Sequence, residues 1–404
     1  MQNQQVFNRY SLAGLGATLI GNGIGRFAYI ALMPALIQAG WFDESQASYL
    51  GAATLIGYIF GAPAIGLLTK RFSIGVLIKA AMLVSSFTYL GCAIENAPIA
   101  WYYMLRTLAG IAGAMLIILA PPIVVRMHTP AIRARISGII FSGIGLGALL
   151  SGTLVPLLIY HSIVSAWLGM GVVALITTFL TWNAWSTQSE QQAAGVVNAS
   201  FANLSNVQRI TVILILIAYS LDAIGYLPHT MFWVDYVVRE LEMPFFTGGL
   251  LWASFGFGAM IGPLLAGVIG DKFGVRCSLV VSFMCKSAGV ALPVISQHPT
   301  ALFVSALLVG IFTPGTVSLV SIYTLESVGY ELHTKAWGMM TMAFALSQGI
   351  VGYLMAYLAP TLSSYNVLFS TSAGVLMISA CLIAISPTPI REPFPEGDAL
   401  QTKD

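Results

Sequence analysis

The sequence predicts an all-α membrane protein whose twelve transmembrane helices form two six-helix bundles. Three observations lead to this fold class. The chain is 57% hydrophobic and only 8% charged, whereas soluble domains are about 45–50% apolar and about 25% charged. Apolar runs of membrane-spanning length recur along the whole chain. The second half of the chain also repeats features of the first half at a spacing of about 200 residues.

The charge content excludes several classes of protein. Fifteen acidic residues and seventeen lysines and arginines cannot cover the surface of a water-soluble protein of 404 residues, and they form no basic stripe that could bind nucleic acid. High hydrophobicity with a net charge of only +2 also excludes intrinsic disorder. The four cysteines form no CxxC pair, so we interpret them as buried apolar side chains and expect no metal and no cofactor.

The first half of the chain contains six predicted spans. A bilayer core about 30 Å thick requires about twenty apolar residues per helix. Runs of that kind occupy residues 10–38, 46–69, 74–94, 98–127, 133–159 and 162–184. The first run is too long for the core of a cleavable signal peptide, so we expect it to remain in the mature protein. These spans make up a first bundle at 1–185, and the polar stretch 186–208 is predicted to link it to a second bundle.

The second half contains six more predicted spans and ends in a charged tail. The spans occupy residues 209–238, 245–269, 275–296, 299–326, 333–359 and 363–386. They give a second bundle at 209–390 and a tail at 391–404. With the amino terminus inside, thirteen lysines and arginines fall on or near the cytoplasmic side, and only Arg239 falls on the opposite side. The positive-inside rule therefore predicts that both termini are cytoplasmic.

When the two halves are aligned at their repeat, spans one and seven carry polar residues at equivalent positions. Asn22, Gly25, Arg26 and Tyr29 fall against Asp222, Gly225, Tyr226 and His229. Within each span the polar side chains lie at i, i+4 and i+7, which predicts one polar stripe on each helix. Because each half has six spans, both halves enter the membrane in the same orientation, and a pseudo-twofold axis along the membrane normal relates them.

A loop motif between spans eight and nine carries the most specific family resemblance. Its sequence is GVIGDKFGVR at residues 267–276, and its counterpart in the first half is GLLTKRFS at residues 66–73. Over essentially its whole length the chain resembles the major facilitator superfamily. The first-half loop departs from the family pattern, with Lys70 in place of the acid and Ser73 in place of the second glycine. The resemblance implies a cytoplasmic gating loop that contains Gly66, Arg71, Gly267, Asp271, Lys272, Gly274 and Arg276.

Three further segments resemble the same superfamily. RTLAG at 106–110 resembles its intramembrane arginine motif, and GIGLGALLSG at 143–152 resembles its glycine-rich antiport motif without the proline. GIGRFAY at 23–29, followed by Pro34, is similar to the first span of a bacterial YbfB/YjiJ-like subgroup of permeases. The resemblance implies a major facilitator fold in the bacterial cytoplasmic (inner) membrane. It also implies that spans one and seven line a central cavity, with the substrate near the midplane.

Among the charged residues inside predicted spans, four stand out: Arg26, Arg106, Asp222 and Lys286. A charge at mid-bilayer costs about 2.5–3.5 kcal/mol even on a lenient insertion scale, so each is a candidate functional residue. Our main hypothesis is that Asp222 carries a coupling proton and that Arg26 or Arg106 interacts with it or with an anionic part of the substrate. Burial raises the pKa of a carboxylate and a nearby arginine lowers it, so an arginine that moves would switch proton affinity. His229 is a candidate proton relay.

Each of these residues also has a purely structural interpretation. Arg106 could brace helix packing, Arg26 and Asp222 could form a static charge pair, and His229 could satisfy a local hydrogen bond. Lys286 lies in span nine, which the resemblance makes peripheral, and we interpret it as structural.

Polar and aromatic side chains of spans one, four, seven and eight are predicted to contact the substrate: Asn22, Arg26, Tyr29, Arg106, Tyr226, His229 and Trp252. The two arginines indicate a small organic solute that is anionic or zwitterionic. We therefore expect a secondary transporter without enzymatic activity that works by alternating access, coupled to protons, with export as the favoured direction. It needs only the lipid bilayer, protons and the solute, and no obligate protein partner. Uptake by symport is the first alternative, followed by a non-transporting sensor and a membrane-embedded enzyme.

Overall fold

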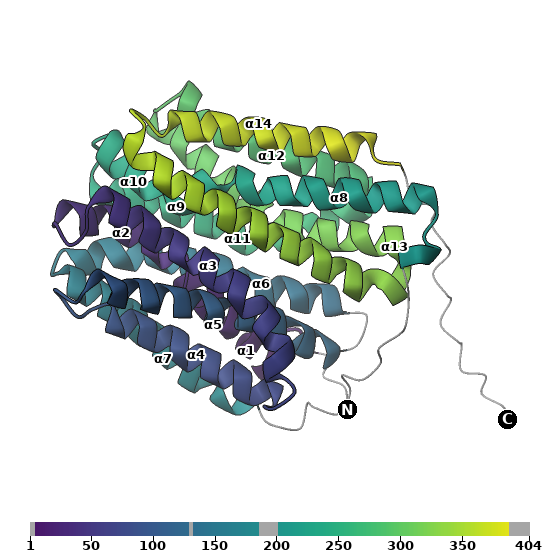
Figure 1. The fold of residues 1–404 in the computed structure, drawn as a ribbon, viewed down its shortest axis with the longest axis horizontal. Helices are drawn as coiled ribbons and strands as arrows, with labels where there is room; N and C mark the ends of the chain where they lie inside the picture. The colour runs from purple at the N-terminus through teal and green to yellow at the C-terminus, as the bar shows by residue number, and fades with distance from the viewer. Residues whose placement is uncertain (1–4, 129–131, 186–200, 388–404) are drawn as a thin grey trace.

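The computed structural model describes residues 5–128, 132–185 and 201–387, and this part of the chain folds into helices that lie side by side along one long axis (Figure 1). Twelve helical segments among the described residues are long and apolar enough to cross a membrane. The predicted all-α architecture with twelve spans is therefore confirmed. Most of the predicted linker and the whole predicted tail lie outside the described residues, so the proposed bundle boundaries remain predictions.

The first half of the chain supplies six of these spans. The first span consists of α1 (Arg9–Thr18), the π-helix η1 (Leu19–Ile24) and α2 (Ala28–Gln38). It is followed by α3 (Glu44–Leu68), α4 (Ile74–Gly91), α5 (Ile99–Arg126), α6 (Arg133–Ile159) and α7 (Ile163–Thr181), which ends in the short 3-10 helix η3 (Trp182–Ala184). Polar caps mark several helix starts. At the start of α3, for example, the backbone N–H of Gln46 donates to the Asp43 carboxylate over 2.7 Å.

The second half follows the same order of elements. A short 3-10 turn, η5 (Phe201–Asn203), precedes α8 (Asn206–Gly225), which continues in three short pieces, α9 (Leu227–Met231), α10 (Trp233–Asp235) and the π-helix η6 (Tyr236–Glu240). It is followed by α11 (Phe245–Phe273), α12 (Val275–Ile295), α13 (Pro299–Leu358), η7 (Ala359–Thr361) and α14 (Asn366–Ile385). α13 contains two spans because its backbone turns sharply at Gly329, where φ is 74°.

Spans one and seven are interrupted at equivalent places. In span seven the regular helix ends at Gly225, although the predicted span continues to residue 238. Pro228 explains this interruption, because it has no backbone N–H and its ring would clash with the carbonyl of residue 224 in a continuous helix. In span one, the π-helix Leu19–Ile24 ends next to Gly25, which stands 200 positions before Gly225. Wide helical turns of this kind occur frequently at functional sites.

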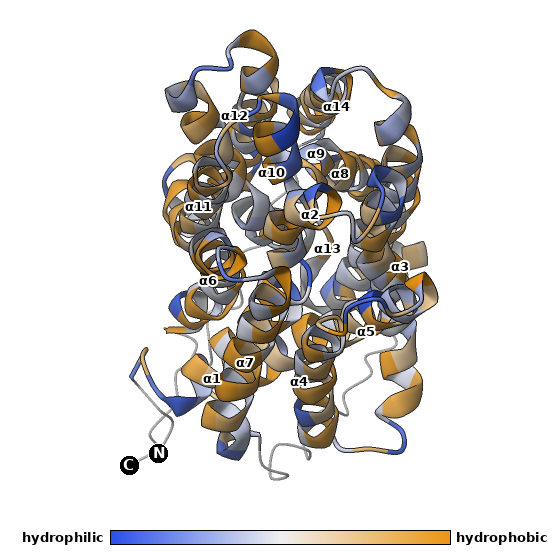
Figure 2. Ribbon diagram, turned by 90° about the vertical axis from the view of Figure 1, so that its left-hand side faces the viewer, coloured by the Kyte–Doolittle hydropathy of each residue, from blue (hydrophilic) through white to orange (hydrophobic). Residues whose placement is uncertain are grey.

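The helices of the two halves form two groups that meet along two helix pairs. In Figure 2, which looks down the helices, α1, α4 and α7 lie below, and α8, α12 and α14 lie above. Between the groups, α6 packs against α11, and α3 packs against α13. The α6–α11 contact brings backbones together, since a Cβ atom on Gly145 would lie 2.2 Å from the backbone nitrogen of Met260. Small residues permit this close approach, and the arrangement is consistent with the predicted pair of bundles.

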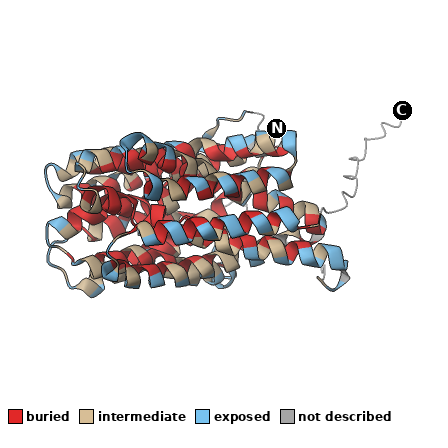
Figure 3. Cartoon of the chain, turned by 90° about the horizontal axis from the view of Figure 1, so that it is seen from above, coloured by how far each residue is buried: buried red, intermediate tan, exposed pale blue. Residues whose placement is uncertain are grey.

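The buried residues gather in the interior, and the exposed residues lie on the outward faces of the helices (Figure 3). Large hydrophobic side chains point outward, including Leu180 (81% exposed), Ile385 (70%) and Val268 (67%). A soluble protein would bury such side chains, whereas lipid solvates them as well as a protein core does. The outer surface of the protein therefore suits a bilayer.

Candidate functional site

Asp222 of α8 and Lys286 of α12 form an ion pair inside the second half of the protein. The Lys286 Nζ lies 2.6 Å from Asp222 Oδ1, and the side chains are 0% and 1% exposed respectively. The sequence suggests Arg26 or Arg106 as the charged neighbour of Asp222, but in this structure Lys286 occupies that place. The second carboxylate oxygen, Asp222 Oδ2, is buried and has no hydrogen-bond partner among the described residues.

A chain of polar contacts leads from this ion pair to the first half of the protein. The Lys286 Nζ lies 5.3 Å from the centroid of the Tyr226 ring. The Tyr226 hydroxyl accepts a hydrogen bond from Gln348 Nε2 of α13. Arg26, at the break in span one, donates from Nη1 to Gln348 Oε1 over 2.8 Å. We call these five residues, from Asp222 through Lys286, Tyr226 and Gln348 to Arg26, the polar chain.

Arg106 of α5 lies apart from the polar chain and holds the break in span one. Its Nη1 donates to the backbone carbonyl of Gly25 over 3.0 Å and to the Tyr89 hydroxyl over 3.3 Å. Tyr89 in turn donates to the carbonyl of Ile24 over 2.5 Å. The guanidinium also lies 4.5 Å from the centroid of the Tyr29 ring. Arg106 is 2% exposed, and its Nε and Nη2 have no hydrogen-bond partner among the described residues.

The structural role of Arg106 has a clear physical cause. The π-helix widens the turn before Gly25 and leaves carbonyls without a regular helical partner. Inside a membrane such carbonyls need another donor, and Arg106 and Tyr89 supply it. The two unused nitrogens of Arg106, Nε and Nη2, leave the same side chain able to donate to another acceptor.

His229 lies in a local aromatic site and not in the polar chain. Its Nε2 is 2.8 Å from Ser305 Oγ, which donates to the carbonyl of Gly289 over 2.6 Å. The imidazole stacks on Trp233, with ring centroids 4.4 Å apart and planes 14° apart. The predicted stripe of Asp222, Tyr226 and His229 therefore does not form, because the helix ends at Gly225 before the last two residues. These contacts correspond to the structural interpretation of His229, and its proposed relay role stays untested.

Trp252 belongs to an aromatic wall that joins the two halves beside Arg26. Its Nε1 donates to Ser151 Oγ of α6 over 3.1 Å, and its ring stacks on Phe255 at 4.5 Å. Phe27 meets the Trp252 ring edge-on at 5.7 Å. The Arg26 guanidinium carbon lies 5.3 Å from the Phe27 ring centroid. The aromatic wall therefore begins beside Arg26 of the polar chain and forms an apolar surface between the two halves.

The internal space next to Arg26 is small in this conformation. It is lined on one side by Asn22 and Arg26 and on the other by Thr54, Leu55 and Tyr58. Its volume of about 10 Å³ is close to that of one water site. All of its lining residues belong to the first half, and in this conformation it has no room for an organic solute.

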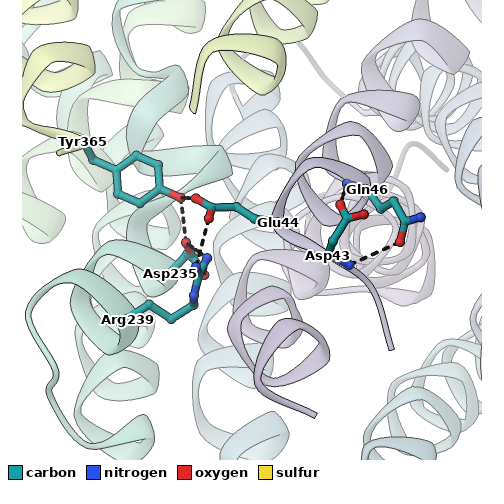
Figure 4. Close-up of polar contacts among 6 residues, drawn as sticks. All are labelled: Asp43, Glu44, Gln46, Asp235, Arg239 and Tyr365. Atoms are coloured by element: carbon teal, nitrogen blue, oxygen red, sulfur yellow. Dashed lines mark hydrogen bonds and ion pairs between the residues drawn. The ribbon is translucent and has the colours of Figure 1, made fainter. Parts of the chain in front are cut away.

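A second polar cluster ties the two halves together at one end of the helices (Figure 4). Arg239 Nη2 lies 3.1 Å from Glu44 Oε2 of α3, and Arg239 Nη1 lies 3.0 Å from Asp235 Oδ2. The Tyr365 hydroxyl donates to Asp235 Oδ2 over 2.7 Å. Burial and the nearby Asp235 carboxylate raise the pKa of Tyr365, so this hydroxyl remains a donor. We call Glu44, Asp235, Arg239 and Tyr365 the Glu44 network.

The predicted gating residues cluster where α3 meets α4 and where α11 meets α12, and several of them lie within the helix ends. Gly274 separates α11 from α12 with φ of 81°, a conformation that favours glycine. Arg276 Nε donates to the carbonyl of Ile383 over 3.3 Å, which joins this loop to the end of α14. Gly66, Arg71 and Lys272 are exposed, and a Cβ on Gly66 or Gly267 would meet open space. The side chain of Asp271 lies outside the described part.

Sequence reasoning missed Gln348 and the Glu44 network. Gln348 is an amide within the apolar run 333–359, and that polarity was the signal that could have identified it. Glu44 is far from Asp235 and Arg239 in the sequence and becomes a neighbour of Arg239 only when the two halves pack. Asn22 lines the small internal space, and Tyr29 donates its hydroxyl to the carbonyl of Ala47 over 2.8 Å.

Comparison with known proteins gives a coherent set of relatives. The sequence pattern of the family described as "Uncharacterised MFS-type transporter YbfB" matches residues 18–384. A protein of Haemophilus influenzae whose name proposes metabolite transport is 23% identical over 393 residues, which cover 92% of this chain and 93% of that protein. The 4-hydroxybenzoate transporter PcaK of Acinetobacter baylyi is 23% identical over 414 residues, which cover 90% of this chain and 87% of PcaK.

Proposed function

The chain belongs to the YbfB family of MFS-type transporters, and we propose that it moves a small organic acid across the membrane by alternating access, coupled to a proton that binds Asp222. Its twelve apolar helices make it an integral membrane protein. The family consists of transporters and not of enzymes. Substrate, coupling ion and direction are the proposed parts.

The buried ion pair of Asp222 and Lys286 is the observation that carries this proposal. Two charges without water are expensive to keep in a protein interior, and such a pair is weak evidence for stability alone. A carboxylate changes its proton affinity when a neighbouring cation moves away. Asp222 has such a neighbour at 2.6 Å, in a helix other than its own. Relative movement of α8 and α12 would therefore convert a structural change into a change of protonation.

Two arginines of the first half favour an acid as the solute. The Arg26 Nη2, and the Nε and Nη2 of Arg106, are buried without a hydrogen-bond partner among the described residues. A guanidinium binds carboxylates in a two-point geometry. The aromatic wall of Phe27, Trp252 and Phe255 lies beside Arg26 and suits an aromatic ring. The name of the relative PcaK makes 4-hydroxybenzoate the first solute to test.

Export in exchange for protons is the direction that the glycine-rich run 143–152 favours. In the structure this run packs on both neighbours, with Gly147 against Gly23 of span one and Gly145 against α11. Uptake together with protons is the second candidate. The ion pair favours this direction, because the proton that neutralises Asp222 and the anion that binds a nearby cation compensate each other's charge.

The orientation in a bacterial inner membrane is also proposed. The excess of lysine and arginine on one side favours cytoplasmic termini. The Glu44 network would then close the external end, and the junctions of α3 with α4 and of α11 with α12 would lie at the cytoplasmic gate. In a variant without the native cysteines, Glu95→Cys should react with a membrane-impermeant thiol reagent added to intact cells, whereas Arg71→Cys should not.

Flux measurements in liposomes test the function. Purified protein is reconstituted with radioactive 4-hydroxybenzoate on one side and a pH step imposed across the membrane. Uptake with protons predicts that the solute accumulates on the alkaline side, and exchange predicts that it accumulates on the acidic side. Asp222→Asn should abolish the response to the pH step, while the exposed Glu95→Gln serves as the control. Full proton-driven accumulation by Asp222→Asn would refute the assignment of Asp222.

A further inference from the structure

We infer that Lys286 receives the anionic group of the solute once a proton has bound to Asp222, so that solute and proton occupy the second half of the protein together. This inference rests on the proposed function in its second form, uptake together with protons, and extends it to a residue that the sequence marked as structural. It starts from the charges, because Lys286 and Asp222 are buried and lie 2.6 Å apart.

The ion pair is electrically balanced only in two states. In the empty state the Asp222 carboxylate compensates the Lys286 ammonium. When a proton from water binds the carboxylate, Asp222 becomes a neutral acid and Lys286 keeps a buried charge without a counter-ion. A buried charge left alone is strongly unfavourable, and a carboxylate of the solute restores the balance. The states with proton alone or solute alone are both unfavourable, and this penalty couples the two ligands.

The atoms around the pair suit this exchange. Asp222 Oδ2 is free of hydrogen-bond partners among the described residues, so a proton can bind there while Oδ1 keeps its contact. The Lys286 ammonium has three donors, and Oδ1 accepts one of them. The remaining donors can meet a second acceptor without breaking the helix packing.

The polar chain shows where the solute would lie. Lys286 faces the Tyr226 ring at 5.3 Å, and the Tyr226 hydroxyl is joined through Gln348 to Arg26. An acid-bearing solute placed along Tyr226 would have Lys286 on one side and Arg26 of the other half on the other side. In this conformation Gln348 Oε1 accepts a hydrogen bond from Arg26. The solute would therefore displace a neutral amide oxygen from Arg26 and not a carboxylate.

Binding and transport by four variants test the inference, with 4-hydroxybenzoate as the probe and Lys79→Gln as a lysine control outside the polar chain. Lys286→Gln should raise the KM at least tenfold, and Lys286→Arg should recover part of the affinity because it keeps the charge. Asp222→Asn, which imitates the protonated acid, should still bind and exchange the probe but bind no proton with it. The double variant that combines Lys286→Gln with Asp222→Asn should fold without the ion pair and still fail to bind the probe.

A proton count distinguishes this role from a purely structural one. In weakly buffered solution the intact protein should take up about one proton for each probe molecule bound, and Asp222→Asn none. Full transport by Lys286→Gln, or recovery of transport in the double variant, would overturn the role of Lys286 and leave the proposed function in place. Failure of the intact protein to bind or move any acid in a panel of small aromatic and aliphatic carboxylates would overturn both proposals.

Discussion

The two halves of the protein stabilise a buried cation in different ways. In the first half, Arg106 donates to a backbone carbonyl and a hydroxyl and lies over the Tyr29 ring. In the second half, Lys286 pairs with a carboxylate. At equivalent positions in the repeat, Asn22 stands against Asp222. One half has an amide where the other has an acid.

This difference separates a constant charge from a variable one. Guanidinium remains charged in proteins and can be solvated by neutral acceptors. A lysine paired with an acid can lose its counter-ion by a single protonation. We therefore expect the first half to attract the solute in every conformation and the second half to respond to protons. The predictions below test this division, beginning with the largest effect.

Lys286→Met should destabilise the protein by about 3–5 kcal/mol, because it leaves the Asp222 carboxylate buried without its cation. Replacing both residues, with Lys286→Met and Asp222→Leu, should recover most of that loss. Unfolding in detergent, followed by the intrinsic fluorescence of tryptophan, measures both effects. A double variant as unstable as the single one would show that packing and not charge explains the loss.

Arg106→Ala should cost about 2–4 kcal/mol, since it removes the donor to Gly25 and Tyr89 and each lost buried hydrogen bond costs about 1–3 kcal/mol. Transport should fall as well, because the break in span one loses its support. Arg106→Lys keeps the charge but cannot reach two acceptors in the same geometry, so it should recover only part of the stability. If Arg106→Lys restores full stability and transport, the brace does not depend on the guanidinium.

Gln348→Glu should raise the KM for an acid about tenfold, or about 1.4 kcal/mol, because the new carboxylate would bind Arg26 in place of the solute. Gln348→Leu removes the amide without adding charge and is the matched control. Its KM should stay the same or decrease, since Arg26 loses a competitor. Uptake measured over a range of solute concentrations separates KM from the maximal rate. Equal KM values for the two variants would contradict this prediction.

Glu44→Gln should have the smallest effect, about 1 kcal/mol or less, because half-exposed ion pairs contribute little and salt screens them. It removes one ion pair between the halves and leaves Arg239 paired with Asp235. We expect a modest increase in the fraction of molecules open at this end. Thiol labelling of a cysteine introduced at Ala359, which is buried beside the Glu44 network in this conformation, measures that fraction at low and high salt. Labelling that does not change with the substitution would show that other contacts close this end.

The sequence predicted the spans well because their ends follow from apolar length and local caps. It predicted the site only in part. Asp222 and Arg26 were identified as buried charges, but their partners depend on how each helix is rotated about its axis, which hydropathy does not specify. Lys286 belongs to a span that the family resemblance makes peripheral, but α12 directs its side chain toward Asp222 of α8. His229 was assigned to the stripe of Asp222 because a continuous helix was assumed, and Pro228 ends that helix early.

The two acidic partners of Arg239 can bind it at different stages of biogenesis. Its first partner, Asp235, is four residues earlier in the same segment, and its second partner, Glu44, comes from the other half of the chain. The local pair can form while the segment is being inserted, so the arginine is neutralised early and opposes membrane insertion less than an isolated cation would. Glu44 joins when the halves assemble. The contact of Arg239 with Glu44 therefore reports the last step of assembly.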